Sequence, residues 1–481
     1  MFQITRNLIS SLNHNRVIYC HWKSNVNLVE ACNGYDDLDL LIDPNSFSIF
    51  NSIINELGFK QGLNFSQHHW GVLHFYGLDS LTGEILHLHV YLKIVTGASL
   101  TKPIHIPLEN FYLGLCSYHE TGFKVPQKHL ELFTYLIRLS WKYTGLVEIV
   151  LLNREKNRII KELNYLYDNN IINELSKFLD QNDFGVSIEH VTKFVNVLYN
   201  GNFIAKFFYA FKFRYQAKVN VKHNFIYRLF NGLKIAFMRI STKIFKNNKK
   251  ILLTGGRTIA IVGLDGSGKS TVVGELEKWL KIHFQVNTCH FGKPRSSFRF
   301  ILINVLIKLL RKFKKLRKEI RANNEKVDYE GQYSFFYSLR NYVLSYDRMH
   351  IALKMHGFSL RGKIVLFDRY KSASRFMMDS PRLCYLRAKG INKVLAKIEE
   401  YNYSRIPSVD ILIHLKVDVE NAVKRNHLRV KTGKESEEFI RKRYLINDGI
   451  EYESANILNV NSDVEIHEML LNIKTYIWSK L

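Results

Sequence analysis

The sequence lacks the features that mark secreted and membrane-spanning proteins. Its five cysteines are scattered and odd in number, with no Cys-x-x-Cys pair, which argues against a disulfide framework and a zinc ribbon. The N-terminal residues have neither the basic region nor the continuous apolar core of a signal peptide. Apolar runs such as residues 301–307 (ILINVLI) are far shorter than the roughly 20 residues that span a bilayer. These absences predict a reduced, cytoplasmic protein.

Acidic residues are missing or nearly missing from two long parts of the chain, and the positive charge is localised there. Residues 190–264 contain 14 Lys and Arg but no acid, and residues 291–321 contain 11 against the single acid Glu319. Together these stretches carry +24 of the formal net charge of +26, so the rest of the chain is nearly neutral. Such a concentration of charge indicates a surface for an anionic partner.

Apolar residues are abundant enough for several folded domains. The chain has 481 residues, of which 46% are hydrophobic and 13% aromatic, and this excludes wholesale disorder. A chain of this length exceeds one ordinary core, so about two to four domains are expected. Residues 1–120 alternate short β-rich runs with polar turns and predict a small α/β domain. In residues 121–250 apolar residues recur every three or four positions, which predicts a helical, basic connector.

The clearest motif is a glycine-rich loop between a predicted strand and a predicted helix. The apolar run TIAIVG leads into GLDGSGKST, and TVVGELEKWLKIHF continues with helical spacing. Strand, glycine loop and helix in this order are the context of a phosphate-binding loop, whose N–H groups would face ATP. Lys269 is expected to bridge the β- and γ-phosphates, Ser270 to ligate Mg²⁺ and Thr271 to bind the α-phosphate. The predicted nucleotide-binding residues are Gly263, Gly266, Ser267, Gly268, Lys269, Ser270 and Thr271.

Four segments occur in the order found in thymidylate kinases. GLDGSGKST resembles that family's form of the loop, including the aspartate Asp265, and KIVLFDRY resembles its strand with the Asp-Arg-Tyr signature. PSVDILIHLKVDVENAVKRNHLRV resembles the next strand and the arginine-bearing lid, and NILNVNSDVEIHEM resembles the final strand and helix. The resemblance covers about residues 258–481. It implies a P-loop, parallel-sheet α/β kinase domain over residues 251–481, an ATP-dependent phosphotransferase similar to nucleoside monophosphate kinases.

The residue chemistry at these motifs agrees with phosphoryl transfer. Asp368 ends a buried apolar strand, where an acid suits Mg²⁺, and Arg369 beside it would bind the acceptor phosphate. Arg425 and Arg429, four residues apart on one helical face, would close over the transferred group, unless they are ordinary surface arginines. The resemblance implies that Asp265 helps to place the metal and the acceptor. The predicted catalytic residues are Asp265, Lys269, Arg369, Arg425 and Arg429.

The acceptor is less well defined than the donor. Residues 286–297 (VNTCHFGKPRSS) lack the glutamate of the family's Arg-Glu-Pro turn, and DRMH at residues 347–350 is one residue tighter than the family's base-facing element. Thymidine monophosphate is the leading prediction for the acceptor. One alternative is a kinase of the same fold that acts on a sugar, lipid or polymer phosphate in envelope polysaccharide synthesis. Another is a nucleic-acid-binding protein that uses ATP as a regulatory ligand.

The N-terminal residues resemble a second family. HWKSN followed by YDDLDLLID is similar to the small-residue turn and Asp-x-Asp strand of nucleotidyltransferases, with Asp37 and Asp39 on one face as ligands of Mg²⁺. The usual glycine is missing, and His87 and His89 occur where a third carboxylate is expected. The resemblance implies a nucleotidyltransferase-like domain over residues 1–120, either active or reduced to binding or regulation. The five histidines within 22 residues suggest metal binding but fit no standard spacing: His68, His69, His74, His87 and His89.

Two basic segments carry apolar residues at helical spacing. Residues 299–321 would present an apolar stripe on one side and Lys and Arg on the other. Such a helix packs on the kinase core, lies on an anionic membrane or binds nucleic acid, and the sequence leaves all three open. The aromatic and basic residues 206–215 (KFFYAFKFRY) would add a second membrane anchor. The expected location is therefore the cytoplasm, with peripheral binding at the inner face of the membrane as a further possibility.

Overall fold

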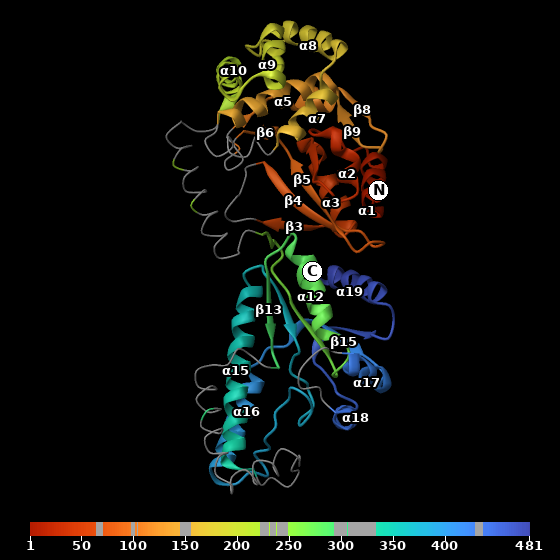
Figure 1. The fold of residues 1–481 in the computed structure, drawn as a ribbon, viewed down its shortest axis with the longest axis vertical. Helices are drawn as coiled ribbons and strands as arrows, with labels where there is room; N and C mark the ends of the chain where they lie inside the picture. Colours follow the sequence, from red (N-terminus) through yellow and green to blue (C-terminus); the bar gives the residue numbers. More distant parts are fainter. Residues whose placement is uncertain are drawn as a thin grey trace. The chain divides into compact units, whose positions relative to one another are not determined.

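The chain falls into two compact units, residues 1–248 and 249–481 (Figure 1). The computed structural model describes residues 1–63, 71–97, 102, 104–144, 155–221, 230, 237, 249–292, 305, 333–428 and 436–481. Of the sequence-based predictions, His68, His69, Arg429 and, apart from Val305, the basic segment 299–321 lie outside these residues. No helix in the described part of the chain combines the length and the hydropathy needed to cross a membrane.

The first unit is built on a mixed β-sheet. Its strands lie in the order β1 (Tyr19–His21), β2 (Leu38–Ile42), β5 (Ile85–Tyr91), β4 (Val72–Leu78) and β3 (Lys60–Leu63). Only the pair β2 and β5 is parallel among these neighbours, and the other pairs are antiparallel. The alternating residues of β2 and β5 divide between two faces. Leu38, Leu40, Leu86, Leu88 and Val90 pack in one core with α1 (Gln3–His14), α2 (Leu28–Cys32) and α3 (Phe47–Glu56).

Helices and a few short strands form the rest of the first unit. Trp22, which follows β1, and Tyr91 of β5 share a second core with apolar side chains of the helices named below. The sheet and the helical region of the first unit are therefore packed together. Asp168 and Asn202 cap the helices α8 (Asn169–Gln181) and α10 (Phe203–Gln216) by accepting hydrogen bonds from backbone N–H groups, as helix-capping residues do. The helices are α4 (Glu109–Gly114), α5 (Lys128–Tyr143), α7 (Lys156–Leu166), α8 (Asn169–Gln181), α9 (Ile188–Asn200) and α10 (Phe203–Gln216), with short 3₁₀ turns at Asn25–Asn27 and Pro44–Ser46. Short strands are β6 (Val95–Thr96), β7 (Ile104–His105), β8 (Cys116–Tyr118), β9 (Lys124–Pro126) and β10 (Asn220–Val221).

The second unit contains a parallel sheet with helices on both faces. Its strands lie in the order β13 (Val286–His290), β14 (Ile364–Asp368), β12 (Thr258–Gly263), β15 (Val409–Lys416) and β16 (Ser454–Asn461). Every neighbouring pair in this sheet is parallel. The central strand β12 is buried along its whole length, as expected for a strand covered on both faces. The predicted fold class, α/β with a parallel sheet in the C-terminal half, is confirmed.

The helices of the second unit leave the carboxyl edge of this sheet to loops. The helices are α12 (Lys269–Lys281), α15 (Phe335–Ser359), α16 (Gly390–Ser404), α17 (Val419–Leu428), α18 (Glu437–Ile446) and α19 (Ile466–Lys480), and a short strand, β11 (Ile251–Leu252), precedes β12. Ala352 and Met355 of α15 and Tyr403 of α16 share a core with one face of the sheet. Helices α12 and α19 also contact the sheet strands. Because ligands of open α/β sheets bind outside the carboxyl ends of the strands, the loop after β12 lies where a site is expected.

Candidate functional site

The glycine loop after β12 lies tightly against two neighbouring elements. Gly263 has φ of 144° and Gly266 has φ of 86°, both in the region that favours glycine. A Cβ atom on Gly263 would lie 2.4 Å from the carbonyl oxygen of Leu415 in β15. A Cβ atom on Gly266 would lie 2.8 Å from the Cα of Ala422 in α17. Only glycine therefore allows the backbone to take this path.

Helix α12 begins directly after the loop without a side-chain cap. The N-cap residue Gly268 has φ of 85° and no side chain that could accept a hydrogen bond from the first turn. The first N–H groups of a helix have no partner within the helix, and the helix dipole places positive charge there. This end of α12 can therefore bind an anion such as a phosphate group.

Lys269 is buried at this helix start. Its side chain is folded back on the loop, where Nζ donates to the carbonyl oxygen of Leu264 at 2.6 Å and to Ser267 Oγ at 3.4 Å. Burial lowers the pKa of Lys269 to about 8, and the positive charge of Arg369 acts in the same direction. The ammonium group thus has backbone and hydroxyl partners but little water, and a nearby anion would stabilise its charge.

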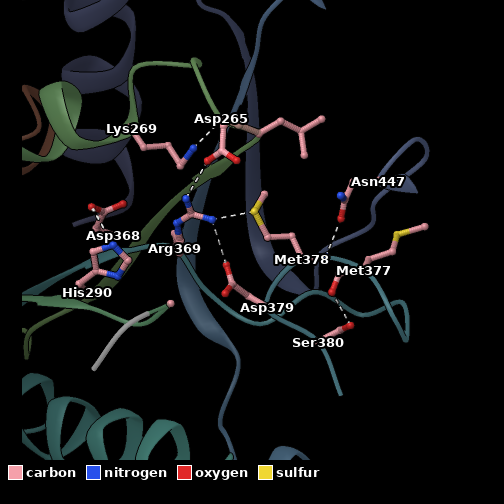
Figure 2. Close-up of polar contacts among 12 residues, drawn as sticks. Asp265, Lys269, His290, Asp368, Arg369, Met377, Met378, Asp379, Ser380 and Asn447 are labelled. Atoms are coloured by element: carbon pink, nitrogen blue, oxygen red, sulfur yellow. Dashed lines mark hydrogen bonds and ion pairs between the residues drawn. The ribbon is translucent and has the colours of Figure 1, made fainter. Parts of the chain in front are cut away.

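Ser270 and Asp368 face one another across the loop. Asp368 ends β14, which pairs in parallel with β12, and Ser270 Oγ donates to Asp368 Oδ2 at 3.1 Å. The other carboxylate oxygen, Oδ1, is buried and accepts no hydrogen bond from the residues that the structure describes. His290 Nε2 lies 3.9 Å from Oδ2 (Figure 2). A hydroxyl and a carboxylate with a bare oxygen are the kinds of ligand that Mg²⁺ takes in proteins, so both residues fit such an ion.

The carboxylate of Asp265 forms ion pairs with two arginines and is mostly buried. Arg369 Nη2 lies 2.8 Å from Oδ1 of Asp265, and Arg443 Nη1 of α18 lies 2.5 Å from Oδ2. Burial acts to raise the pKa of Asp265, but the charges of Arg443, Arg369 and Lys269 outweigh it and hold the pKa below its ordinary value. Tyr444 donates to the backbone oxygen of Asp265 at 2.9 Å. The aspartate thereby attaches α18 to the loop.

Arg369 lies between two acids in a strained stretch of backbone. Its Nη1 is 3.8 Å from Asp379 Oδ2 and also contacts the sulfur of Met378 at 2.7 Å (Figure 2). Arg369, Phe376 and Asp379 have φ of 74°, 65° and 61°, values that residues with side chains rarely adopt. Strain of this kind costs about 1 to 3 kcal/mol per residue and gathers at functional sites. The segment after β14 is therefore held in shape by its surroundings.

A second buried arginine extends this charge network. Arg348 Nη2 of α15 lies 2.7 Å from Asp379 Oδ1, and its Nη1 donates to the Tyr403 hydroxyl at 2.5 Å. Nη2 also donates to the carbonyl oxygen of Gly292 at 3.0 Å. The sequence drew attention to Arg348 only as part of an imperfect motif. No sequence signal identified Asp379 or Arg443.

The predicted lid arginine Arg425 contacts the loop from α17. Its Nη1 is 3.3 Å from the carbonyl oxygen of Gly266, and its Nη2 donates to the carbonyl oxygen of Ser462 at 2.7 Å. Asp463 lies 3.5 Å away. Arg425 therefore braces the loop against the end of β16 in this arrangement, while its predicted companion Arg429 is outside the described residues.

In the first unit, the predicted metal ligands Asp37 and Asp39 lie together with histidines. Asp37 Oδ1 is 2.7 Å from His87 Nδ1, and Asp39 Oδ1 is 3.2 Å from His89 Nδ1. Lys23 Nζ also lies 2.8 Å from Asp39 Oδ1. Burial acts to raise the pKa of Asp39, but Lys23 and His89 lower it well below the ordinary value. Both carboxylates are therefore engaged by basic groups.

Comparisons with known proteins give relatives for part of the chain. No family model matches it. It is 28% identical over 177 residues to the uncharacterized ATP-binding protein YghR of Escherichia coli, strains K12 and O6:H1, which covers 35% of this chain and 68% of the relative. Among the solved structures that match part of the chain is deoxyadenosine kinase from M. mycoides with dCMP and a flexible dCDP bound. It is 18% identical with a TM-score of 0.26, and the match covers 46% of this chain and 98% of the other. Thymidylate kinase from Candida albicans, at 18% identity and a TM-score of 0.27, covers 47% and 90%.

Proposed function

We propose that the second unit transfers a phosphoryl group from ATP to an acceptor that carries a phosphate. The observation that carries the proposal is the convergence at one sheet edge of an uncapped helix start, the buried Lys269 and the pair Ser270–Asp368. Phosphoryl transfer depends on positioning and on cations that neutralise the moving charge. The similarity to an ATP-binding protein supports ATP as the donor.

ATP and Mg²⁺ would bind next to one another at the glycine loop. The first N–H groups of α12 and the ammonium of Lys269 would bind the β- and γ-phosphates. Ser270 and Asp368 would hold Mg²⁺, and this assignment is supported by Oδ1 of Asp368, which has no hydrogen-bond partner within the described part of the chain. When bound, Mg²⁺ supplies positive charge next to the phosphate oxygens.

The acceptor would bind on the side of Arg369 and Arg348. A guanidinium can bind a phosphate through two parallel hydrogen bonds, and Arg369 already donates one hydrogen bond to Asp265 Oδ1, at 2.8 Å. An acceptor phosphate at Arg369 would therefore replace the carboxylate of Asp265 as a partner of this arginine. Thymidine monophosphate is the leading proposal for this acceptor. A sugar, lipid or polymer phosphate is the alternative, because the residues on this side belong to no complete nucleotide-binding motif.

An acceptor screen tests the function. Full-length protein, Mg²⁺ and γ-labelled ATP are incubated with nucleoside monophosphates, sugar phosphates and lipid phosphates in parallel. We expect label transfer to one acceptor class, reduced at least ~100-fold in Lys269→Ala, because the variant loses a charge-stabilising group. Lys278→Ala, an exposed lysine on the same helix, is the matched control. Slow hydrolysis of ATP without any acceptor, stimulated by nucleic acid, would instead favour an ATP-regulated nucleic-acid-binding protein.

We further propose that α10 binds the surface of an anionic membrane. The side chains Ile204, Phe208, Phe211 and Tyr215 form a stripe at helical spacing and are between 54% and 86% exposed. Lys212 beside this stripe is also exposed, and residues 190–264 contain no acid. An apolar face flanked by basic residues is typical of helices that lie in the interface of anionic lipids.

Vesicle flotation tests this second proposal. We expect the full-length protein to float with anionic but not with neutral vesicles, and the triple variant Phe208→Ser, Phe211→Ser, Tyr215→Ser to lose this binding. Tyr35→Ser, which removes an 85% exposed aromatic ring from another part of the first unit, should float like the wild type. Equal flotation of the triple variant, or a steep salt-dependent affinity for DNA or RNA without flotation, would contradict the membrane assignment.

A further inference from the structure

Three histidines of the first unit gather on one face of its sheet. His87 and His89 are two residues apart in β5, so both side chains point to the face opposite Leu86, Leu88 and Val90. The antiparallel pairing of β4 with β5 places His74 directly opposite His89. The strands concerned are adjacent in Figure 1.

The ring nitrogens of these histidines have the separation of ligands on one metal ion. His74 Nδ1 and His87 Nε2 are 3.2 Å apart, and one nitrogen from each of the three rings lies within 4.8 Å of the others. Two imidazole nitrogens bound to the same tetrahedral zinc ion are about 3.3 to 3.4 Å apart. This is the one such group of His, Cys, Asp or Glu side chains in the described ranges of the chain.

Two carboxylates orient the rings for metal binding. Asp37 Oδ1 lies 2.7 Å from His87 Nδ1, and Asp39 Oδ1 lies 3.2 Å from His89 Nδ1. A proton on each Nδ1, donated to a carboxylate, leaves the lone pair on Nε2 for a metal, as in carboxylate–histidine–metal groups. Tyr76 stacks on the His87 ring at a centroid distance of 4.4 Å and an angle of 6°, which restricts its rotation.

The site is partly accessible to solvent and to a further ligand. The side chains of His87 and His89 are 12% and 18% exposed, and that of Asp37 is 41% exposed. Asp37 Oδ2 lies 3.6 Å from His89 Nε2, so this carboxylate can reach a metal at the histidines. Asp39 is less available, because Lys23 forms an ion pair with it.

We propose that His74, His87 and His89 bind a divalent transition-metal ion, with zinc as the ion that best fits the donor set. Three imidazole nitrogens favour zinc and its neighbours in the first row over Mg²⁺, which prefers oxygen ligands. Three protein ligands also leave a coordination position for Asp37, for water or for an anionic ligand. This metal site belongs to the first unit and does not depend on phosphoryl transfer by the second.

Metal titration of the untagged, chelator-treated full-length protein tests the proposal. We expect calorimetry to detect one Zn²⁺ site that excess Mg²⁺ does not displace and that is lost in His74→Ala and His87→Ala. Asp37→Asn should weaken binding by about 10- to 100-fold, because it removes the partner that orients His87. His14→Gln, an exposed histidine at the end of α1, should bind as the wild type does.

A spectroscopic measurement keeps the proposal testable if a histidine variant fails to fold. Co²⁺ bound by three imidazoles in a four-coordinate site gives visible absorption bands, which we expect in the wild type and which Zn²⁺ should abolish. Circular dichroism checks that each variant retains the native secondary structure. Absence of these bands in the wild type, unchanged Zn²⁺ affinity in folded His74→Ala, or displacement of Zn²⁺ by Mg²⁺ would overturn the assignment.

Discussion

The pKa of Lys269 leads to a prediction about the pH dependence of ATP binding. Burial of the side chain lowers this pKa to about 8, whereas an exposed lysine titrates near 10.4. Only the charged ammonium attracts the β- and γ-phosphates. Bound ATP would stabilise the charge and raise the pKa again, so ATP affinity should fall as the pH rises through about 8.

The size of the effect follows from the fraction of protonated lysine. At about pH 9, one unit above the pKa, roughly one molecule in eleven carries the charge. Affinity should therefore be about tenfold lower at pH 9 than at pH 7, which corresponds to about 1.4 kcal/mol. Binding at pH 9 should also take up close to one proton, because the lysine becomes charged in the complex.

Calorimetric titration with a non-hydrolysable ATP analogue and Mg²⁺ measures both quantities. Affinities at about pH 7, 8 and 9 give the pH profile, and buffers with different ionisation enthalpies give the number of protons taken up. Lys269→Ala should bind weakly at every pH and take up no proton. Lys278→Ala, with an exposed lysine replaced on the same helix, should keep the wild-type profile. A wild-type affinity that stays constant between pH 7 and 9 would refute the reasoning.

Three further predictions concern other charged residues of the second unit. Asp265→Asn should lower the free energy of unfolding by about 3 kcal/mol in chemical denaturation, because two partly buried arginines each lose an acidic partner, whereas exposed Asp448→Asn should change little. Arg369→Ala should raise the acceptor KM or lower kcat while ATP affinity stays near wild type; loss of ATP affinity instead would place this arginine at the donor. Glu399 is buried and its pKa is raised to about 7, so its stabilising contribution is full below about pH 4.5 and is lost as the pH rises through 7. Glu399→Gln should remove this pH dependence, and an unchanged slope of unfolding free energy against pH would show that another group causes it.

The parts of the second unit that could be predicted are those encoded by local pattern. The run TIAIVG forms a strand because each of its residues is buried, and the glycines after it take φ values that other residues disfavour. Asp368 could be placed at the carboxyl edge because it ends a second buried strand. Ser270 and Asp368 are 98 residues apart and form a hydrogen bond. Their proximity could be expected because the glycine loop and the second buried strand each predict a position at the same edge of the sheet.

Contacts that depend on tertiary packing could not be predicted. Asp379 reaches Arg348 and Arg369 from an irregular segment with positive φ, and no motif marks that segment. Arg443 reaches Asp265 from α18, a helix whose sequence has no distinctive feature. In the first unit, the contact of His74 with His87 depends on the register of β4 and β5, and a shift of one residue would move His74 to the other face. Spacing along the sequence alone could not reveal it.

The charge network gives a physical reason for an aspartate within the glycine loop after β12. Along Arg443, Asp265, Arg369, Asp379 and Arg348 the charges alternate, so each arginine has an acid as its neighbour. Arginines held this close without the acids would repel one another, and the strained segment after β14 would lose contacts that stabilise it. The same acids compete with any phosphate for Arg369. Asp265→Asn should therefore separate the two roles: a less stable fold, together with an Arg369 that is freer to bind an anionic acceptor.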